Sequence, residues 1–212
     1  MARILLLLPT STYRAPDFVR AAAHLGVDVV VGSEERQAMA GDMGDRAVVV
    51  PLGDLERATE AIVALSTRTS IDAVVAVDDP GILVAATAGE RLGFPHNPPS
   101  AVATTRDKAS MRAALARAGV AQPRFAVADD PAALPDVGYP CVVKPVGLSA
   151  SRGVIRADDR AAAHAAAARV RAITDGPLLV EEYVPGVEVA VEGLLRAGVL
   201  EILAVFDKPD PL

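Results

Sequence analysis

A lysine and a loop rich in glycine and serine stand next to each other in the middle of the chain. The apolar run Cys141–Val143 is followed at once by Lys144, which predicts a buried strand whose last residue brings a positive charge out of the core. The loop Gly147–Gly153 then contains two glycines, two serines and an arginine. Glycine lets backbone N–H groups turn toward a ligand, and serine hydroxyls add donors. The pair is suited to holding a polyphosphate; a plain hairpin with one solvated lysine is the competing interpretation.

Lysine is rare in this chain, and its positions are therefore informative. Only three of the 21 lysines and arginines are lysines, namely Lys108, Lys144 and Lys208. A lysine carries a compact ammonium on a slim stem, which reaches between phosphates as a point charge. Since arginine serves elsewhere as the ordinary surface cation, the three lysines are candidates for positions where arginine does not fit.

The composition limits the classes of protein to be considered. The chain has 212 residues, of which 51% are hydrophobic and only 3% aromatic, so a core of alanine, valine and leucine is expected. A net charge of −6 argues against binding of nucleic acid through a general basic surface. The single cysteine, Cys141, excludes an internal disulfide and is expected to be buried. The segment Met1–Pro9 predicts a first strand of a cytoplasmic protein, and no stretch approaches the length of a membrane span.

The first half of the chain alternates between strand and helix patterns. Short apolar runs at 4–8, 27–31, 47–50 and 73–77 are separated by helical segments at 16–25, 54–65 and 81–92. Such alternation predicts a doubly wound parallel sheet, in which ligands gather at the carboxyl ends of the strands. The segments Pro9–Arg14, Gly32–Ser33 and Asp78–Asp79 are therefore expected at one edge. No G-x-G-x-x-G follows the first strand, so an NAD-dependent oxidoreductase is disfavoured.

Two polar features of the sequence, the Asp78–Asp79 pair and Lys108, each allow a functional and a purely structural interpretation. Asp78 and Asp79 could hold a metal or an ammonium group, but a helix cap before Pro80 is the favoured interpretation. Lys108 stands in the first turn of a helix predicted over 107–118, where a cation opposes the helix dipole. An anion nearby would justify that placement; a solvated lysine is the alternative.

The second half begins after a proline-rich segment. Pro95, Pro98 and Pro99 predict a domain boundary or a rigid connector. Beyond it we expect strands at 124–127, 141–143 and 178–180, a helix at 158–170 capped by Asp158, and a hairpin. The two strands of that hairpin are expected at 189–195 and 199–206.

From Arg106 onward the chain resembles the ATP-grasp superfamily, particularly carboxylate–amine ligases related to the carbamoyl-phosphate synthase large chain and to amino-acid ligases. The resemblance rests on blocks in a fixed order: Arg106–Lys108, Val142–Pro145, Gly147–Gly153, and Glu181–Val184 followed by Glu188. It implies an α/β protein with an N-terminal parallel-sheet domain over residues 1–97. An α+β ATP-grasp domain would follow, with 98–188 forming the ATP lid and adenine edge. Residues 189–212 would be the first strands of its second subdomain, which the resemblance implies is incomplete.

The resemblance also implies roles for individual residues. Lys108 and Lys144 would hold the ATP phosphates, and the lid formed by residues 147–153 would close over them. Adenine would be read at the strand edge, mainly by the backbone of Glu182 and Val184, and Glu188 would accept from the ribose hydroxyls. The expected nucleotide-binding residues are Lys108, Lys144, Gly147, Ser149, Ser151, Gly153, Glu181, Glu182, Tyr183, Val184 and Glu188.

The activity implied by the resemblance is ATP-dependent ligation. A small carboxylic acid, such as an amino acid, would be activated as an acyl phosphate and attacked by an amine, with ATP and magnesium as cofactors. The family's magnesium ligands lie beyond the position of Leu212, so no catalytic residue and no metal ligand is assigned here. The alternative is therefore a non-catalytic nucleotide-binding fragment, or a subunit that needs a partner. Residues Val189–Phe206 are expected to expose an apolar face and to mediate self-association.

Overall fold

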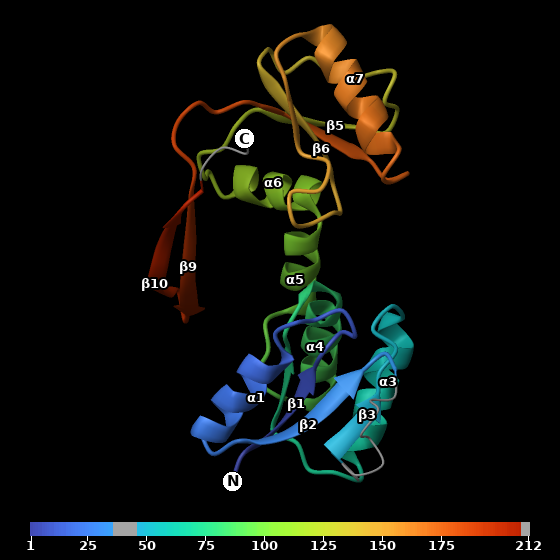
Figure 1. Ribbon diagram of the computed structural model, residues 1–212, viewed down its shortest axis with the longest axis vertical. Helices are drawn as coiled ribbons and strands as arrows, with labels where there is room; N and C mark the ends of the chain where they lie inside the picture. Colours follow the sequence, from blue (N-terminus) through green and yellow to red (C-terminus); the bar gives the residue numbers. More distant parts are fainter. Residues whose placement is uncertain (36–45, 209–212) are drawn as a thin grey trace. The chain divides into compact units, whose positions relative to one another are not determined.

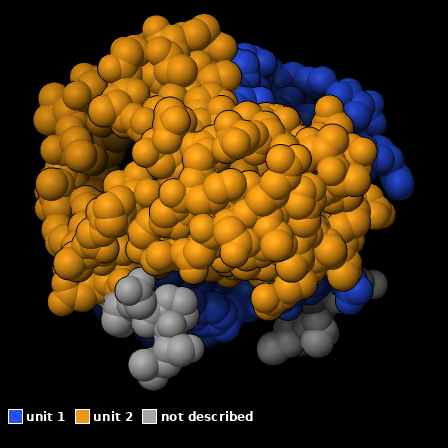
Figure 2. Space-filling model, turned by 90° about the horizontal axis from the view of Figure 1, so that it is seen from above, with its two compact units in different colours: residues 1–111 blue, residues 112–212 orange. Residues whose placement is uncertain are grey.

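The computed structural model describes residues 1–35 and 46–208 (Figure 1). They divide into two compact units, residues 1–111 and residues 112–212 (Figure 2). The last four positions of the expected third region, Pro209–Leu212, lie outside the described residues. Within the described ranges, no helix is both long and apolar enough to cross a membrane.

The first unit contains the predicted parallel sheet. Its strands are β1 (Arg3–Leu7), β2 (Asp28–Ser33), β3 (Ala47–Val49) and β4 (Ala73–Ala76), in the order β3-β2-β1-β4 (Figure 1). All three pairings are parallel, as the alternation of strands and helices predicted. The fold class expected from the sequence is confirmed for this unit.

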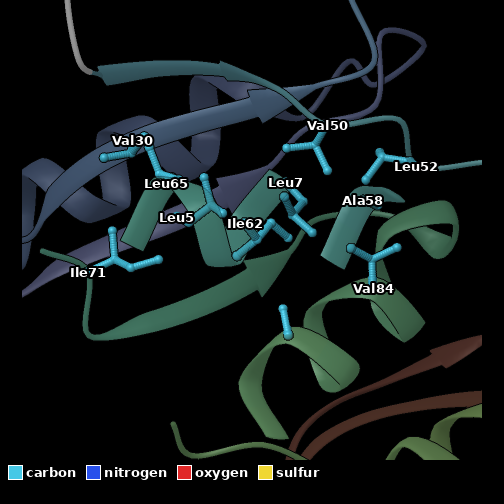
Figure 3. Packing of buried hydrophobic residues seen from close by; sticks show 11 residues of the cluster. Leu5, Leu7, Val30, Val50, Leu52, Ala58, Ile62, Leu65, Ile71 and Val84 are labelled. Carbon is cyan, nitrogen blue, oxygen red and sulfur yellow. The ribbon is translucent and has the colours of Figure 1, made fainter. Parts of the chain in front are cut away.

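Both faces of strand β1 are buried, which explains its uninterrupted apolar run. Leu5 and Leu7 pack with Ile62 of helix α3 (Leu55–Ser66) and with Val84 of helix α4 (Asp79–Leu92) (Figure 3). Leu6 points to the opposite side and belongs to a smaller cluster, which Phe18 of helix α1 (Ala15–His24) helps to cover. Alternate residues of one strand therefore serve two separate apolar layers.

The carboxyl ends of β1, β2 and β4 meet at one edge of the sheet, as expected. The N–H of Thr10 donates to Oε2 of Glu34 at 2.9 Å, which ties the loop after β1 to the end of β2. Asp78 occupies the N-cap position of α4, as the favoured interpretation predicted, but its side chain makes no capping hydrogen bond. Asp79 forms an ion pair with Arg106 at 2.6 Å. Both carboxylates thus stand at the start of α4.

One helix was not expected from the sequence. Helix α5 (Pro99–Arg106) begins at the last proline of the proline-rich segment, which was predicted from the sequence to be a boundary or connector only. Proline is tolerated in the first turn of a helix because the missing N–H has no partner there in any case. The next helix, α6 (Lys108–Arg117), follows Asp107, whose Oδ1 accepts from the N–H of Ser110 at 2.6 Å.

The second unit contains an antiparallel sheet with a helix on one face. The strands are β5 (Phe125–Ala128), β6 (Cys141–Pro145), β7 (Ile155–Ala157) and β8 (Leu178–Glu182), in the order β5-β8-β6-β7. Helix α7 (Arg160–Arg171) packs against β6 and β7 (Figure 1).

Two details of the second unit differ from the prediction. Helix α7 is capped by Asp159, which accepts from the N–H of Ala162 at 2.8 Å, and not by Asp158. Asp158 instead accepts from Arg156 at 2.8 Å. The two aspartates are adjacent and equally good caps, so only the backbone path decides between them. Strand β6 also continues to Pro145, one residue past Lys144, which was predicted to be the last residue of the strand.

The end of the described chain forms the expected hairpin. Strands β9 (Val189–Arg196) and β10 (Val199–Asp207) pair antiparallel and make a two-stranded sheet. Their connection places Ala197 at φ 49° and Gly198 at φ 81°. Two successive positive φ values are typical of the tight turn that matches the twist of a hairpin.

Candidate functional site

The two faces of the antiparallel sheet differ in chemistry. Val143 and Val180 point toward α7 and belong to the apolar core of the second unit. Side chains alternate along a strand, so Lys144 and Glu181 must lie on the opposite face. The register pairs Val142 with Glu181, which makes Lys144 the diagonal neighbour of Glu181. This second face, which carries Lys144 and Glu181, is named the polar face of the sheet and is the candidate site.

Lys144, Glu181 and Arg112 form a nearly buried charge cluster on this face. Nζ of Lys144 donates to Oε1 of Glu181. Nε of Arg112 donates to the other oxygen, Oε2, at 3.0 Å, and Nη2 of the same guanidinium forms an ion pair with Oε2 at 2.8 Å. The exposed fractions of the three side chains are only 14%, 9% and 17% respectively. Two cations therefore share one carboxylate away from bulk water, and the cluster keeps a net positive charge.

Arg112 was missed by the sequence analysis, although the sequence carries a signal for it. It stands four residues after Lys108 on helix α6, and residues at that spacing share one face of a helix. A second cation one turn after a candidate phosphate ligand could have been noted. Its partner Glu181, 69 positions further along the chain, could not have been.

The loop after Lys144 is anchored at both ends and strained in the middle. At its start, the N–H of Val146 donates to the carbonyl of Pro177 at 3.1 Å. At its end, Gly153 has φ 74°, and a β-carbon there would lie 3.3 Å from Pro145. Between these anchors, Ala150 and Ser151 both have φ 56°, a left-handed conformation that costs free energy for residues other than glycine. Gly147, Ser149 and Ser151 are exposed.

The end of strand β8, which is predicted to contact adenine, combines an aromatic ring with exposed backbone. Tyr183 lies beside Arg156, whose guanidinium carbon is 4.2 Å from the centre of the ring. Val184 lies beyond the end of β8 with 63% of its surface exposed. Within the described part of the chain, the Val184 N–H donates to no backbone acceptor. A base lying against this edge would therefore meet a backbone donor next to an aromatic ring.

Glu182 forms a different kind of ion pair from Glu181. Its Oε2 accepts from Nε of Arg124 at 3.2 Å, and both side chains are well exposed. Hydrogen bonds from the side chain and the backbone of Arg124 hold the pKa of Glu182 below its ordinary value. The pair therefore stabilises the fold at neutral pH, and this contribution is lost as the pH falls through the lowered pKa.

Glu188 and Lys108 are the remaining predicted nucleotide-binding residues. Glu188, the expected ribose ligand, precedes β9, and its carboxylate accepts from Nζ of Lys208. The Lys208 N–H also donates to the Glu188 carbonyl at 3.1 Å. Lys108 belongs to the unit of residues 1–111, whereas Lys144 belongs to the unit of residues 112–212.

The described residues offer neither a reactive thiol nor a metal cluster. Cys141 is 1% exposed, and burial, followed by the charge of Asp136, raises the pKa of its thiol. A thiol kept protonated is a poor nucleophile, so Cys141 acts as the small buried residue that the sequence predicted. Within residues 1–35 and 46–208, no three histidine, cysteine, aspartate or glutamate side chains lie close enough to hold a metal ion.

Comparison with family models gives two matches in this chain. Residues 19–96 match the model described as the ATP-grasp N-terminal domain. Residues 137–211 match the model described as the ATP-grasp domain. The second match contains Lys144, the glycine and serine loop, Glu181 and Glu188.

Among curated proteins, the chain is similar to two kinds of ligase. It is 29% identical over 180 residues to an alanine–anticapsin ligase of Bacillus subtilis, covering 72% of this chain and 38% of the relative. It is 36% identical over 160 residues to a phosphoribosylamine–glycine ligase of Leifsonia xyli, covering 72% of this chain and 37% of the relative. The matched part is thus less than two fifths of either relative's length.

Solved structures share the fold over the whole chain. An L-amino acid ligase from Bacillus licheniformis superposes with a TM-score of 0.82 at 24% identity, over 100% of this chain and 54% of that one. A carboxyaminoimidazole ribonucleotide synthase from Aspergillus clavatus, solved with ATP, gives a TM-score of 0.71 at 19% identity, over 99% and 55% of the two chains. At these identities the likeness concerns the fold.

Proposed function

This chain belongs to the ATP-grasp superfamily, and on that premise we propose that it binds ATP on the polar face of the sheet β5-β8-β6-β7. The observation that carries the proposal is the position of Lys144. Its ammonium is nearly buried in a cluster of net positive charge, directly before a loop whose backbone is strained. A buried excess of positive charge favours an anion such as a polyphosphate.

The proposed roles of individual residues are those that membership of the ATP-grasp superfamily implies. Lys144 holds the phosphates, together with Lys108, and the loop Gly147–Gly153 covers them with backbone N–H groups and serine hydroxyls. The backbone of Glu182 and Val184 reads adenine beside the Tyr183 ring. Glu188 accepts from the ribose hydroxyls once it releases Lys208.

The reaction that we propose is the joining of a carboxylate to an amine. An oxygen of the carboxylate attacks the γ-phosphorus of ATP, ADP leaves, and an acyl phosphate forms. The amine nitrogen then attacks the carbonyl carbon, phosphate leaves, and the nitrogen loses a proton. Since relatives of this chain are named as ligases of alanine and of glycine, amino acids are the proposed substrates.

The test is ADP release measured with amino acids supplied singly and in pairs, in the presence of magnesium. The proposal expects ADP only when an acid and an amine are both present, with one amide formed per ADP.

The second candidate function is that of a nucleotide-binding module that needs a partner for its metal site. ATP binding without ADP release would support that module.

The loop Gly147–Gly153 is expected to close only when nucleotide is bound. Its exposed residues bury little apolar surface, so local opening needs little free energy. Hydrogen exchange with and without a non-hydrolysable ATP analogue measures this. We expect fast exchange in the free chain and strong protection in the complex, with helix α7 as the internal reference. A loop that is already protected in the free chain contradicts the prediction.

We also propose that two copies of the chain associate through the hairpin β9–β10. Each strand of this two-stranded sheet has one edge unpaired among the described residues, and the hairpins of two copies can pair edge to edge about a two-fold axis. Nine large apolar side chains of the hairpin are at least 50% exposed: Val191, Leu194, Leu195, Val199, Leu200, Ile202, Leu203, Val205 and Phe206.

Sedimentation velocity tests this association. The parent chain is expected to sediment as a dimer or larger species, because pairing removes exposed apolar surface from water. Val205→Lys, at a position that is 59% exposed, should shift the population toward monomer. Val120→Lys, at a position 49% exposed outside the hairpin, is the matched control. A monomeric parent chain at high concentration refutes the proposal.

A further inference from the structure

The division of the Glu181 carboxylate between two cations assigns a role to Arg112. Each oxygen of Glu181 is committed to one partner: Oε1 accepts from Lys144, and Oε2 accepts from Nε of Arg112 and is ion-paired with the same guanidinium. Arg112 comes from helix α6, whereas the other two residues belong to the sheet. The backbone of Arg112 is also held in place, because its carbonyl oxygen accepts a hydrogen bond from Nε2 of Gln122 at 2.9 Å.

The electrostatics of the cluster depend on Arg112. With it, the three side chains carry a net charge of about +1 at low exposure, where charges interact more strongly than in water. Without it, Glu181 and Lys144 would form a neutral pair, and both carboxylate oxygens would be free to draw the single ammonium toward the strand. A lysine held in that way is a weaker partner for a phosphate, because it has to break the only ion pair of Glu181 first.

We propose that Arg112 is a positioning residue for Lys144. By occupying Oε2 it neutralises Glu181 independently of Lys144, so that Lys144 can turn its ammonium to a polyphosphate without leaving a buried carboxylate unpaired. This inference rests on the proposed function, since the polyphosphate is that of ATP. It adds a residue of α6 to the site and explains why the candidate phosphate ligand is paired with an acid in the free chain.

The first experiment compares Arg112→Met and Arg112→Lys with the parent chain. Methionine keeps the apolar stem and removes the charge; lysine keeps the charge and loses the planar guanidinium, whose Nε donates to Oε2. Affinity is measured by competition with a fluorescent ATP analogue, once for ATP and once for adenosine, which has no phosphate. We expect Arg112→Met to weaken ATP binding about ten-fold with adenosine unchanged, and Arg112→Lys to keep most of the ATP affinity.

A double-mutant cycle separates positioning from direct contact with the nucleotide. In a Glu181→Gln background there is no carboxylate for Arg112 to neutralise, so Arg112→Met should change ATP affinity by less than about two-fold. A ten-fold loss that persists in this background means that Arg112 touches the phosphates itself, which overturns the inference. Equal losses for ATP and adenosine mean a merely structural role, which overturns it too.

A second measurement needs no nucleotide and no change at Glu181. Because the chain has only three lysines, carbon-13 labelling at their ε-carbons yields three assignable signals in a heteronuclear NMR spectrum. Arg112→Met should shift the Lys144 signal and leave those of Lys108 and Lys208 in place. An unchanged Lys144 signal overturns the inference. A parent chain that binds no ATP refutes the proposed function instead, whereas an unchanged ATP affinity in Arg112→Met refutes this inference alone.

Discussion

Replacing Lys144 by methionine is expected to weaken ATP binding about 10- to 100-fold, the range that corresponds to losing one or two charge-assisted hydrogen bonds. The stability of the free chain should change little by comparison. Methionine keeps the apolar stem within strand β6, and Glu181 retains its contacts with Arg112. Calorimetric titration with ATP and urea unfolding without nucleotide measure the two effects separately.

The control for this prediction is Arg169→Met. Arg169 is an exposed residue of helix α7, which packs on the apolar face of the sheet, so the change removes one positive charge of the same unit without touching the candidate site. It should leave ATP affinity close to that of the parent. Equal ATP affinity in Lys144→Met and the parent would falsify the assignment of Lys144 as a phosphate ligand.

The largest effect on stability is expected at Glu181. Replacing it by alanine leaves Lys144 and Arg112 side by side without their shared anion, and both are mostly buried. Removing one partner of a buried ion pair costs about 3–5 kcal/mol, because the remaining charge is left uncompensated. Urea unfolding followed by circular dichroism should show the transition at much lower denaturant concentration.

The neighbouring residue supplies the control for this second prediction. Glu182→Ala removes the same side chain one position later, but from an ion pair in which the two side chains are 40% and 70% exposed. Exposed pairs contribute about 0–1 kcal/mol, so the transition should hardly move. If the two alanine variants unfold alike, the burial of the Lys144, Glu181 and Arg112 cluster does not matter to the fold.

The sequence by itself determined the fold class and most of the elements. The parallel sheet of the first unit followed from apolar runs of strand length alternating with helical segments, a pattern that depends on local spacing alone. The hairpin over residues 189–206 and the buried position of Cys141 were predicted in the same way. Helix α5 was missed, because a proline in the first turn of a helix is locally indistinguishable from a proline in a connector.

The candidate site was predicted in part. Residues that are adjacent in sequence were predicted together, whereas contacts that depend on strand register were not. Lys144 and the loop after it are adjacent in sequence, so one stretch of chain reveals them together. Glu181 was expected as part of an adenine-reading edge, but its contact with Lys144 depends on the register between β6 and β8. Neither strand specifies that register alone, since it is set when their apolar sides pack on α7.

Arg112 shows most clearly what only the tertiary structure decided. Its helix does not adjoin Glu181 in sequence, and no local pattern joins an arginine at one position to a glutamate 69 residues later. The two meet because the fold brings helix α6 to the polar face of the sheet, where a carboxylate with low exposure requires cationic partners. The sequence therefore supplied the lysine and its loop, while the packing of helix against sheet decided which charges surround that lysine.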